Sequence, residues 1–338
     1  MDWSLILSWS FFVSLILAAI RLALPVLCAI LGEIITELSG VSNLGMEGVM
    51  AMGGVCGFLV TLNLQKGAMA SHPQAAVWVG LLGGMIAGAL VGLLMAFLSV
   101  TMKADQTVCG VTLVLFGVGL SNYLYRQSVS SLSETIIPLP TIRIPLLSSI
   151  PVLGPILFEQ NSVFYFVMLL VILCSVFLNK TVWGMNIRAV GENPAAAETS
   201  GVSVEGTRYA ATILGAALAG LGGSILTIVQ LGLFNENIIA GKGWVAVALV
   251  IFARWKPGLA LVGALLFGAA DAFQYRIQAI TALSGGTEVM PYEFLLMLPY
   301  LLTIGVLLFR NGTAESPATL GRPYNKGDRY YRTCVRRS

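Results

Sequence analysis

Residues 75–102 read AAVWVGLLGGMIAGALVGLLMAFLSVTM, and this stretch decides the class of fold. It contains no acidic or basic side chain. As a helix it would be about 42 Å long, whereas the hydrocarbon core of a bilayer is about 30 Å thick. Gly80, Gly84, Gly88 and Gly92 recur every four residues and share one helix face, as in helices that pack closely in membranes. We predict a membrane-spanning helix whose glycine face makes either a static or a sliding contact.

The same kind of run recurs along the chain. Runs without ionisable residues also occupy 106–125, 161–179 and 209–235. Apolar segments that each include one charged residue occupy 4–31, 45–64, 257–275 and 290–309. The run from Gly243 to Ala253 would rise only about 17 Å, so it must borrow neighbouring residues, tilt or re-enter the membrane. We predict an all-α polytopic membrane protein with about nine transmembrane helices, within a range of eight to ten.

The composition excludes several classes of protein. Of the 338 residues, 57% are hydrophobic and only 10% are charged, which is too apolar for a soluble globule. The single histidine, His72, excludes a His-rich metal site, and its place in a loop between spans argues against a Ser/His/Asp hydrolase. No GxxxxGK[ST] motif is present, so another chain would have to hydrolyse any ATP. We therefore expect a non-catalytic subunit without metal or cofactor.

Charge is distributed unevenly and predicts an orientation. The segment 310–338 holds seven Lys/Arg and two acidic residues, so the basic character belongs to a tail and does not indicate nucleic-acid binding. With this tail in the cytoplasm and nine crossings, the inner loops carry thirteen Lys/Arg and the outer loops five. Without the short run 243–253 as a crossing, every upstream loop changes side and the count is again thirteen against five, so charge fixes the side of the tail and leaves the upstream loops open. We predict a membrane domain over 1–309 and a cytoplasmic tail over 310–338; with nine crossings, the loop 126–160 lies outside and the loop 180–208 inside.

Two polar, glycine-rich interruptions stand between apolar runs, one in each half of the chain. They read GVSNLGMEG from Gly40 and FNENIIAGKGW from Phe234. Paired broken segments of this kind are the best sequence indication of a transporter's substrate region. We predict that they line a solute pathway, with the candidate residues Asn43, Glu47, Asn235 and Glu236. For Glu47 the alternative is a first-turn acid that complements a helix dipole, and the two roles are compatible.

Other polar residues within the spans are pathway candidates because burying them is costly. The candidates are Gln106, Asn122 and Asp271. So few buried charges suit a neutral polar solute better than an ion-coupled antiporter.

The inner loop contains a short helix signal. Asn193 is a cap residue, Pro194 suits the first helical position and Gly201 suits the end. A helix of about seven residues is marginal alone in water, so something should hold it. A groove on a partner protein and the protein's own membrane domain are both candidates.

Several motifs in series resemble one transporter family, ABC importer permeases of the ribose/branched-chain amino acid type, and most closely its simple-sugar and nucleoside branch. The stretches are SGVSNLGMEG (39–48), GMNIRAVGENPAAAETSGV (184–202), AGLGGS (219–224) and AGKGWVAVALVIFARWKP (240–257). One departure is Leu38, where relatives commonly have Arg, which puts in doubt any salt bridge carried over to that position.

The resemblance implies partners and a coupling site. In that family the inner loop inserts its short helix into an ATP-binding subunit, and the complex includes a second permease subunit and an extracytoplasmic solute-binding protein. The loop and the tail then share the cytoplasmic side, so an even number of crossings must separate them. The short run 243–253 is kept as a crossing because it makes that number four. The residues to which coupling is carried over are Glu192, Asn193, Pro194, Ala196, Glu198 and Gly201.

We therefore expect the permease subunit of an ABC importer in the cytoplasmic membrane, carrying a nucleoside or simple sugar. One alternative is a branched-chain amino acid permease. Another is a secondary transporter that works without ATP.

Overall fold

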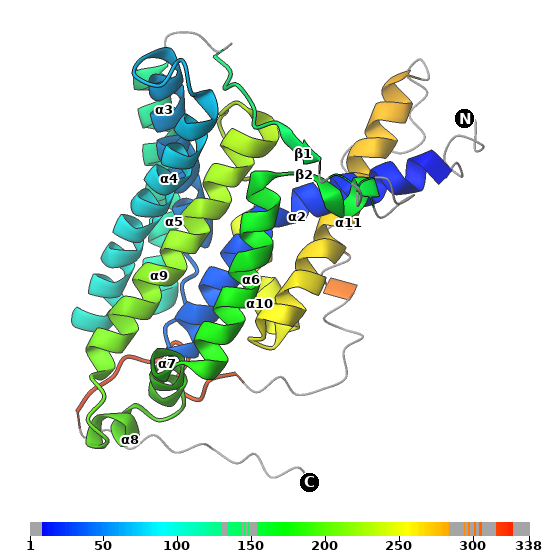
Figure 1. The fold of residues 1–338 in the computed structure, drawn as a ribbon. Coiled ribbons are helices and arrows are strands. Elements are labelled where there is room, and N and C mark those ends of the chain that lie inside the picture. The colour runs from blue at the N-terminus through cyan, green and yellow to red at the C-terminus, as the bar shows by residue number, and fades with distance from the viewer. Residues whose placement is uncertain are drawn as a thin grey trace.

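The structure is a computed structural model that describes residues 9–129, 134–143, 145, 148, 154–283, 294, 297, 301, 304–305 and 316–326. It is almost entirely helical (Figure 1). The α-helices are α2 (Trp9–Leu38), α3 (Met46–Lys66), α4 (Pro73–Ala96), α5 (Gln106–Ser128), α6 (Ser162–Lys180), α7 (Val182–Glu192), α8 (Pro194–Thr199), α9 (Val204–Ser224), α10 (Lys242–Ala253) and α11 (Pro257–Leu283). The π-helical turns are η1 (Phe97–Thr101), η2 (Gly154–Phe158) and η3 (Ile225–Leu231), and the strands are β1 (Thr141–Arg143) and β2 (Glu159–Asn161).

Seven helices in the described residues are long and apolar enough to cross a bilayer. They are Phe12–Leu38, Met46–Lys66, Pro73–Thr101, Gln106–Ser128, Ser162–Lys180, Val204–Leu231 and Pro257–Gln278. The prediction of an all-α, multi-pass membrane protein is confirmed. The predicted span 290–309 lies almost wholly outside the described residues, so the count of nine stays a prediction.

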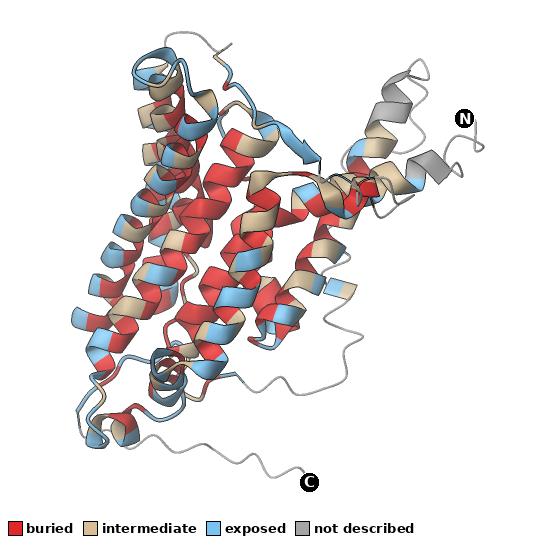
Figure 2. Cartoon of the chain, viewed as in Figure 1, coloured by how far each residue is buried: buried red, intermediate tan, exposed pale blue. Residues whose placement is uncertain are grey.

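The glycine face of α4 makes a close contact inside this chain. A Cβ added to Gly88 would be 2.9 Å from the Cα of Gly220 in α9, and one added to Gly84 would be 2.7 Å from the carbonyl oxygen of Gly53 in α3. Such close backbones are typical of membrane helices. No hydrophobic force drives these helices together in lipid, and small residues let their backbones approach closely enough to pack. The residues between α2, α3 and α9 are buried, whereas the outer faces of the surrounding helices carry exposed residues (Figure 2).

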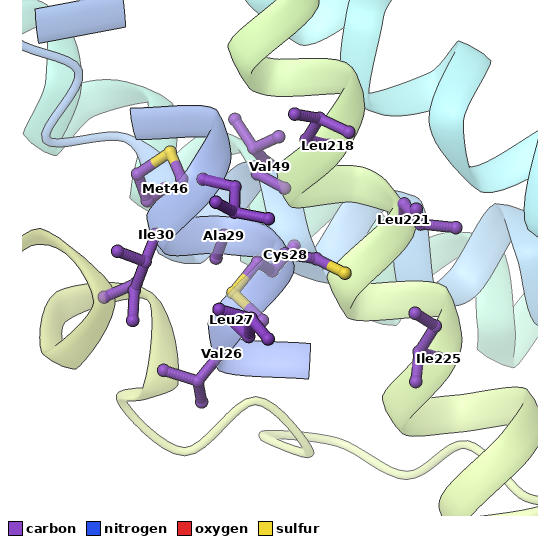
Figure 3. Packing of buried hydrophobic residues seen from close by; sticks show 14 of the residues in the cluster. Val26, Leu27, Cys28, Ala29, Ile30, Met46, Val49, Leu218, Leu221 and Ile225 are labelled. Atoms are coloured by element: carbon purple, nitrogen blue, oxygen red, sulfur yellow. The ribbon is translucent and has the colours of Figure 1, made fainter. Parts of the chain in front are cut away.

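Apolar side chains of α2, α3 and α9 fill the centre of the bundle. Val26, Leu27 and Cys28 of α2 are fully buried, and the α9–η3 helix beside them carries Leu221 and Ile225 (Figure 3). A Cβ added to Gly222 of α9 would lie 3.4 Å from the Cβ of Cys28. This interior ties α2 to the α9–η3 helix, which lies far away in sequence. It provides a rigid frame for the less regular segments described next.

The two ends of the bundle differ in structure. At one end lie the short helices α7 and α8, and at the other lies the antiparallel pair β1–β2 (Figure 1). The predicted inner loop 180–208 is therefore mostly helical, and its last residues already belong to α9. The described part of the predicted outer loop 126–160 begins with the end of α5 and includes the strand pair.

The short apolar run forms α10, which is preceded by non-helical backbone. The chain leaves η3 at Gly232 and becomes helical again only at Lys242. It then runs to Ala253 at the end of the bundle from which α11 rises (Figure 1). The short run is thus a 12-residue helix that follows a non-helical segment, and its predicted crossing of the membrane stays a prediction.

Candidate functional site

The two broken segments meet through Glu47. Its Oε1 accepts a hydrogen bond from the backbone N–H of Gly241 at 2.7 Å, and its Oε2 accepts one from the N–H of Gly243 at 2.8 Å. Both donors belong to the otherwise unpaired N-terminal amides of α10. Glu47 therefore caps a helix that is almost two hundred residues away in sequence, and its carboxylate also lies at the positive end of that helix dipole.

Glycine makes this junction possible. A Cβ on Gly243 would lie 2.4 Å from the backbone nitrogen of Glu47, a distance that real Cβ atoms do not reach. Gly241 has a φ of +82°, in the left-handed region that favours glycine. The N-terminal turns of α3 and α10 consequently abut. On the other side of α3, the backbone of Gly48 lies against Gly117, in the middle of α5, so the junction lies about halfway along the bundle.

A small hollow opens beside the junction. α3, α5 and the segment 232–241 form its wall, and the space between them is about 220 Å³ when the adjoining open solvent is included. The lining residues are Glu47, Ala51, Val118, Ser121, Asn122, Phe234, Asn237, Ile238 and Ile239. Amide groups from Asn122 and Asn237 can both donate and accept hydrogen bonds, and apolar side chains surround them. These groups can bond hydroxyl groups and contact an apolar face, but the hollow as it stands has room for about one water molecule and would have to widen to admit a solute.

An aromatic cluster supports one wall of the hollow. The ring of Phe234 lies 4.9 Å from that of Tyr125 and 6.3 Å from that of Phe58, measured between centroids. Phe234 is buried and anchors one end of the non-helical segment. Asn235, Glu236 and Asn237, which follow, are exposed, whereas Ile239 is buried again before the segment reaches Gly241.

Asn43 and Gln106 lie behind the junction, where they organise the backbone of the first broken segment. The N–H of Asn43 donates to Glu33 Oε1 at 2.9 Å, and its own Oδ1 accepts from the N–H of Gly45. The side-chain Oε1 of Gln106 accepts from the N–H of Ser42 at 2.8 Å. All three side chains that bond this segment are buried, so it is a closely held part of the interior.

Asp271 lies on another side of α10. Its Oδ2 is 3.9 Å from Nζ of Lys242, and both side chains are buried. Removing one member of such a pair would leave a buried charge without its partner. Asp271 and Glu47 thus both act on the first turn of α10, one through a side chain and the other through backbone amides.

Asn235 and Glu236 lie at the exposed side of the second segment. Glu236 forms an ion pair with Arg126, with 2.6 Å between Oε1 and Nη2, at the far end of α5. Neither Asn235 nor Glu236 lines the hollow, whereas the next residue, Asn237, does. The Asn-Glu-Asn motif indicated the place, but the sequence did not identify Asn237 as the inward-facing member.

The inner loop contains the short helix that its capping residues predicted. Asn193 Oδ1 accepts from the N–H of Ala196, Pro194 is the first residue of α8, and Gly201 has a φ of +85° just after its end. Ala196 is exposed, and Glu192 and Asn193 are exposed as well. Alanine methyl groups and helix ends are therefore available to a partner at this end of the bundle.

Glu198 faces the tail of its own chain. Tyr324 OH is hydrogen bonded to its Oε2, and Lys326 Nζ lies 3.2 Å from its Oε1. The hydrogen bond from Tyr324 and the charge of Lys326 hold the pKa of the Glu198 carboxyl below its usual value. No local sequence signal linked residues 316–326 to α8, nor did the sequence single out the buried Arg208 described below.

No group of three potential metal-binding side chains comes together within the described residues.

Comparisons with known proteins agree with this architecture. The model of the family described as branched-chain amino acid transport system / permease component matches residues 15–307. A putative glucose ABC transporter permease protein of Haloferax volcanii is 35% identical, covering 94% of this chain and 99% of the relative. A guanosine ABC transporter permease protein of Bacillus subtilis is 35% identical, and the match covers 92% of this chain and 96% of the relative. A nucleoside ABC transporter permease protein of Lactococcus lactis is 35% identical, and the match covers 89% of this chain and 93% of the relative. No solved structure matches significantly.

Proposed function

Since the chain belongs to the family of branched-chain amino acid transport system permease components, we propose that it is the membrane permease subunit of an ABC importer for a nucleoside or simple sugar. Relatives with 35% identity over nearly the whole chain carry this description, and they support the solute class. The permease itself is non-catalytic. A separate ATP-binding subunit hydrolyses ATP, and an extracytoplasmic binding protein delivers the solute to the cytoplasmic membrane.

The observation that carries the transport pathway is the junction at Glu47. Two non-helical segments meet there, about halfway along the bundle, beside a hollow lined by amide groups. Irregular backbone at membrane depth is stable only where protein covers it or where it lines an aqueous cavity. In the proposal, Glu47 and Asn122 line the solute route, and Asn235 and Glu236 frame its outer mouth. Asn43, Gln106 and Asp271 hold the route in place from behind.

The orientation follows from the same proposal. Helices α7 and α8 lie at the cytoplasmic end, where the ATP-binding subunit contacts Ala196 and its neighbours, and the C-terminal tail lies on that side as well. Strands β1 and β2 lie at the opposite end, within reach of the binding protein. A second permease subunit completes the pathway. Movement of α8 by the ATP-binding subunit then rocks the helices around the junction and opens the hollow to one side and then the other.

The test is reconstituted transport. The permease, copurified with its ATP-binding subunit and reconstituted with its binding protein, should take up radiolabelled guanosine or glucose only when ATP is supplied. Uptake that persists without ATP and follows an ion gradient would identify a secondary transporter and refute the proposal. Uptake of leucine, with neither guanosine nor glucose competing, would assign the protein to the amino acid branch of the family.

The coupling contact needs a separate variant. Replacing the exposed Ala196 by Glu should abolish uptake, because the bulky charge obstructs the surface offered to the ATP-binding subunit. Membrane insertion and docking of the binding protein should be normal. Replacing the half-buried Ala195 by Ser, a small change next to it, is the control and should leave uptake close to the wild-type rate.

A further inference from the structure

The C-terminal segment 316–326 returns to the bundle and contacts three separate elements. Thr319 donates hydrogen bonds from its backbone N–H at 3.0 Å and from its Oγ1 at 2.7 Å to the carbonyl oxygen of Gly191, at the end of α7. The N–H of Gly321 donates to the carbonyl oxygen of Gly40, in the first broken segment. Tyr324 and Lys326 bind Glu198 of α8. One short segment thus connects the α7–α8 loop to the turn that precedes Asn43.

A buried arginine ties the same elements together. Arg208, in the first turns of α9, is only 1% exposed. Its Nε donates to the carbonyl oxygen of Ser39 at 3.2 Å, its Nη1 donates to that of Arg322 at 3.0 Å, and its Nη2 reaches Thr319 Oγ1 at 3.4 Å. A guanidinium offers several donors in a fixed plane, so it can hold separate backbone segments at once.

Packing supports the contact between the tail and α8. Tyr324 is only 7% exposed, and its ring joins a small apolar cluster with Val190 of α7, Ala197 of α8 and Val204 of α9. A helix of six residues has too few internal hydrogen bonds to be stable alone, so its position depends on such contacts. The tail supplies both an apolar contact and a charge-assisted hydrogen bond.

We propose that segment 316–326 is a coupling strut, which holds α8 in the position that the ATP-binding subunit engages and transmits its movement to the Gly40 turn. Tyr324 and Thr319 are positioning residues, because they act through Glu198 and Gly191. The inference rests on the proposed function, which supplies the ATP-binding subunit that engages α8. It goes beyond that function because it assigns a mechanical role to a tail that charge alone marked as a cytoplasmic extension.

The principal variant is Tyr324→Phe, which keeps the ring in its cluster and removes the hydroxyl that bonds Glu198. Its matched control is Arg322→Ala, which removes a charged, exposed side chain from the same segment but retains the carbonyl that Arg208 binds. Glu198→Gln and the double variant with Tyr324→Phe complete a double-mutant cycle.

Two readouts separate the strut from the proposed function. In the purified permease alone, Tyr324→Phe should raise amide hydrogen exchange in residues 194–199 about tenfold or more, as expected for the loss of one charge-assisted hydrogen bond. In the reconstituted complex it should lower solute transported per ATP hydrolysed by about threefold or more, while the ATP-binding subunit still copurifies in equal amount. Arg322→Ala should change neither. The double variant should be no worse than the worse single variant.

Unchanged exchange in residues 194–199 would overturn the proposal, because the tail would then not hold α8. Faster exchange with an unchanged ratio of solute to ATP would also overturn it, since the contact would be structural only. Additive effects in the double variant would show that Tyr324 does not act through Glu198. If the wild-type complex transports without ATP, the proposed function fails, while the exchange experiment still reports on the contact itself.

Discussion

The two glycine-broken segments look alike in sequence but differ in how they are held. In the first, residues 39–45, backbone amides of Ser42 and Asn43 bond to buried side chains of Gln106 and Glu33. The second, residues 232–241, presents most of its polar side chains outward, and Asn237 and Ala240 have positive φ. Buried polar side chains thus hold the backbone of the first segment, whereas the second is held by the buried apolar side chains of Phe234 and Ile239 and exposes its polar residues.

The contrast suggests a division of labour around Glu47. A closely held segment positions the carboxylate, and the carboxylate holds the start of α10 at the end of the less constrained segment. Residues with few buried contacts and exposed backbone are those that open most easily. We expect the second segment to move during transport while the first stays in place relative to α3.

The largest effect should come from breaking the junction sterically. Gly243→Val would place side-chain atoms against the backbone of Glu47 and should destabilise the protein by about 3 kcal/mol or more, with loss of uptake. Gly258→Ala is the control, because an added Cβ there meets nothing within 4 Å. The thermal unfolding midpoint in detergent and uptake per inserted molecule measure both. A normal midpoint for Gly243→Val would contradict the observed contact.

Removing the carboxylate should have the next largest effect. Glu47→Ala leaves two amides of α10 without their acceptor, at a cost of about 1–3 kcal/mol for each buried group. Glu47→Gln retains one acceptor oxygen and should therefore be less impaired. Uptake is compared at equal amounts of inserted protein. Normal uptake per inserted molecule in Glu47→Ala would remove Glu47 from the pathway and leave it only a capping role.

The inner end, where the tail meets the first segment at Gly40, should depend on pH through Glu198. Because the pKa of Glu198 in the folded protein is below its usual value of 4.5, the contact with Tyr324 and Lys326 contributes stability above that value. This contribution should be constant between pH 7 and 5 and disappear as the pH falls below 4.5. Hydrogen exchange of residues 316–326, corrected for its intrinsic pH dependence, measures it. Glu198→Gln should show no such transition, and a transition that persists would contradict this assignment.

The smallest effect is expected at the exposed end of the second segment. The Arg126–Glu236 pair is exposed, and such pairs contribute about 0–1 kcal/mol. Glu236→Gln should shift the unfolding midpoint little and change uptake by about twofold at most. Arg126→Gln breaks the same ion pair from the other side and should have an equally small effect. A loss of uptake many times larger in Glu236→Gln alone would indicate direct contact with the solute.

Much of this fold is predictable because membrane spans are local. The length of an apolar run determines whether it can cross, so spans such as 106–125 agree with α5 to within a few residues. The caps of α8 are local as well. The similar composition of the two broken segments indicated that they belong to one site, and the structure joins them through Glu47.

The rest depends on contacts between residues far apart in the chain. Nothing local distinguishes Asn43, which faces buried backbone, from Asn237, which faces the hollow. The pairing of Lys242 with Asp271 and the return of Tyr324 to α8 likewise need the three-dimensional arrangement. The pattern of polar residues therefore located the site, but it did not predict which side chains line the hollow and which bond buried backbone or face outward.

The most direct test of the central claim is protection of the hollow by solute. In a variant whose native cysteines are replaced by Ser, Val118→Cys puts a thiol in the hollow, and Leu115→Cys puts one on the exposed face of the same helix. We predict that saturating guanosine or glucose, supplied with the binding protein, slows modification of Cys at 118 by a thiol reagent and leaves Cys at 115 unaffected. Equal rates with and without solute at both positions would contradict the claim that the solute passes beside Glu47.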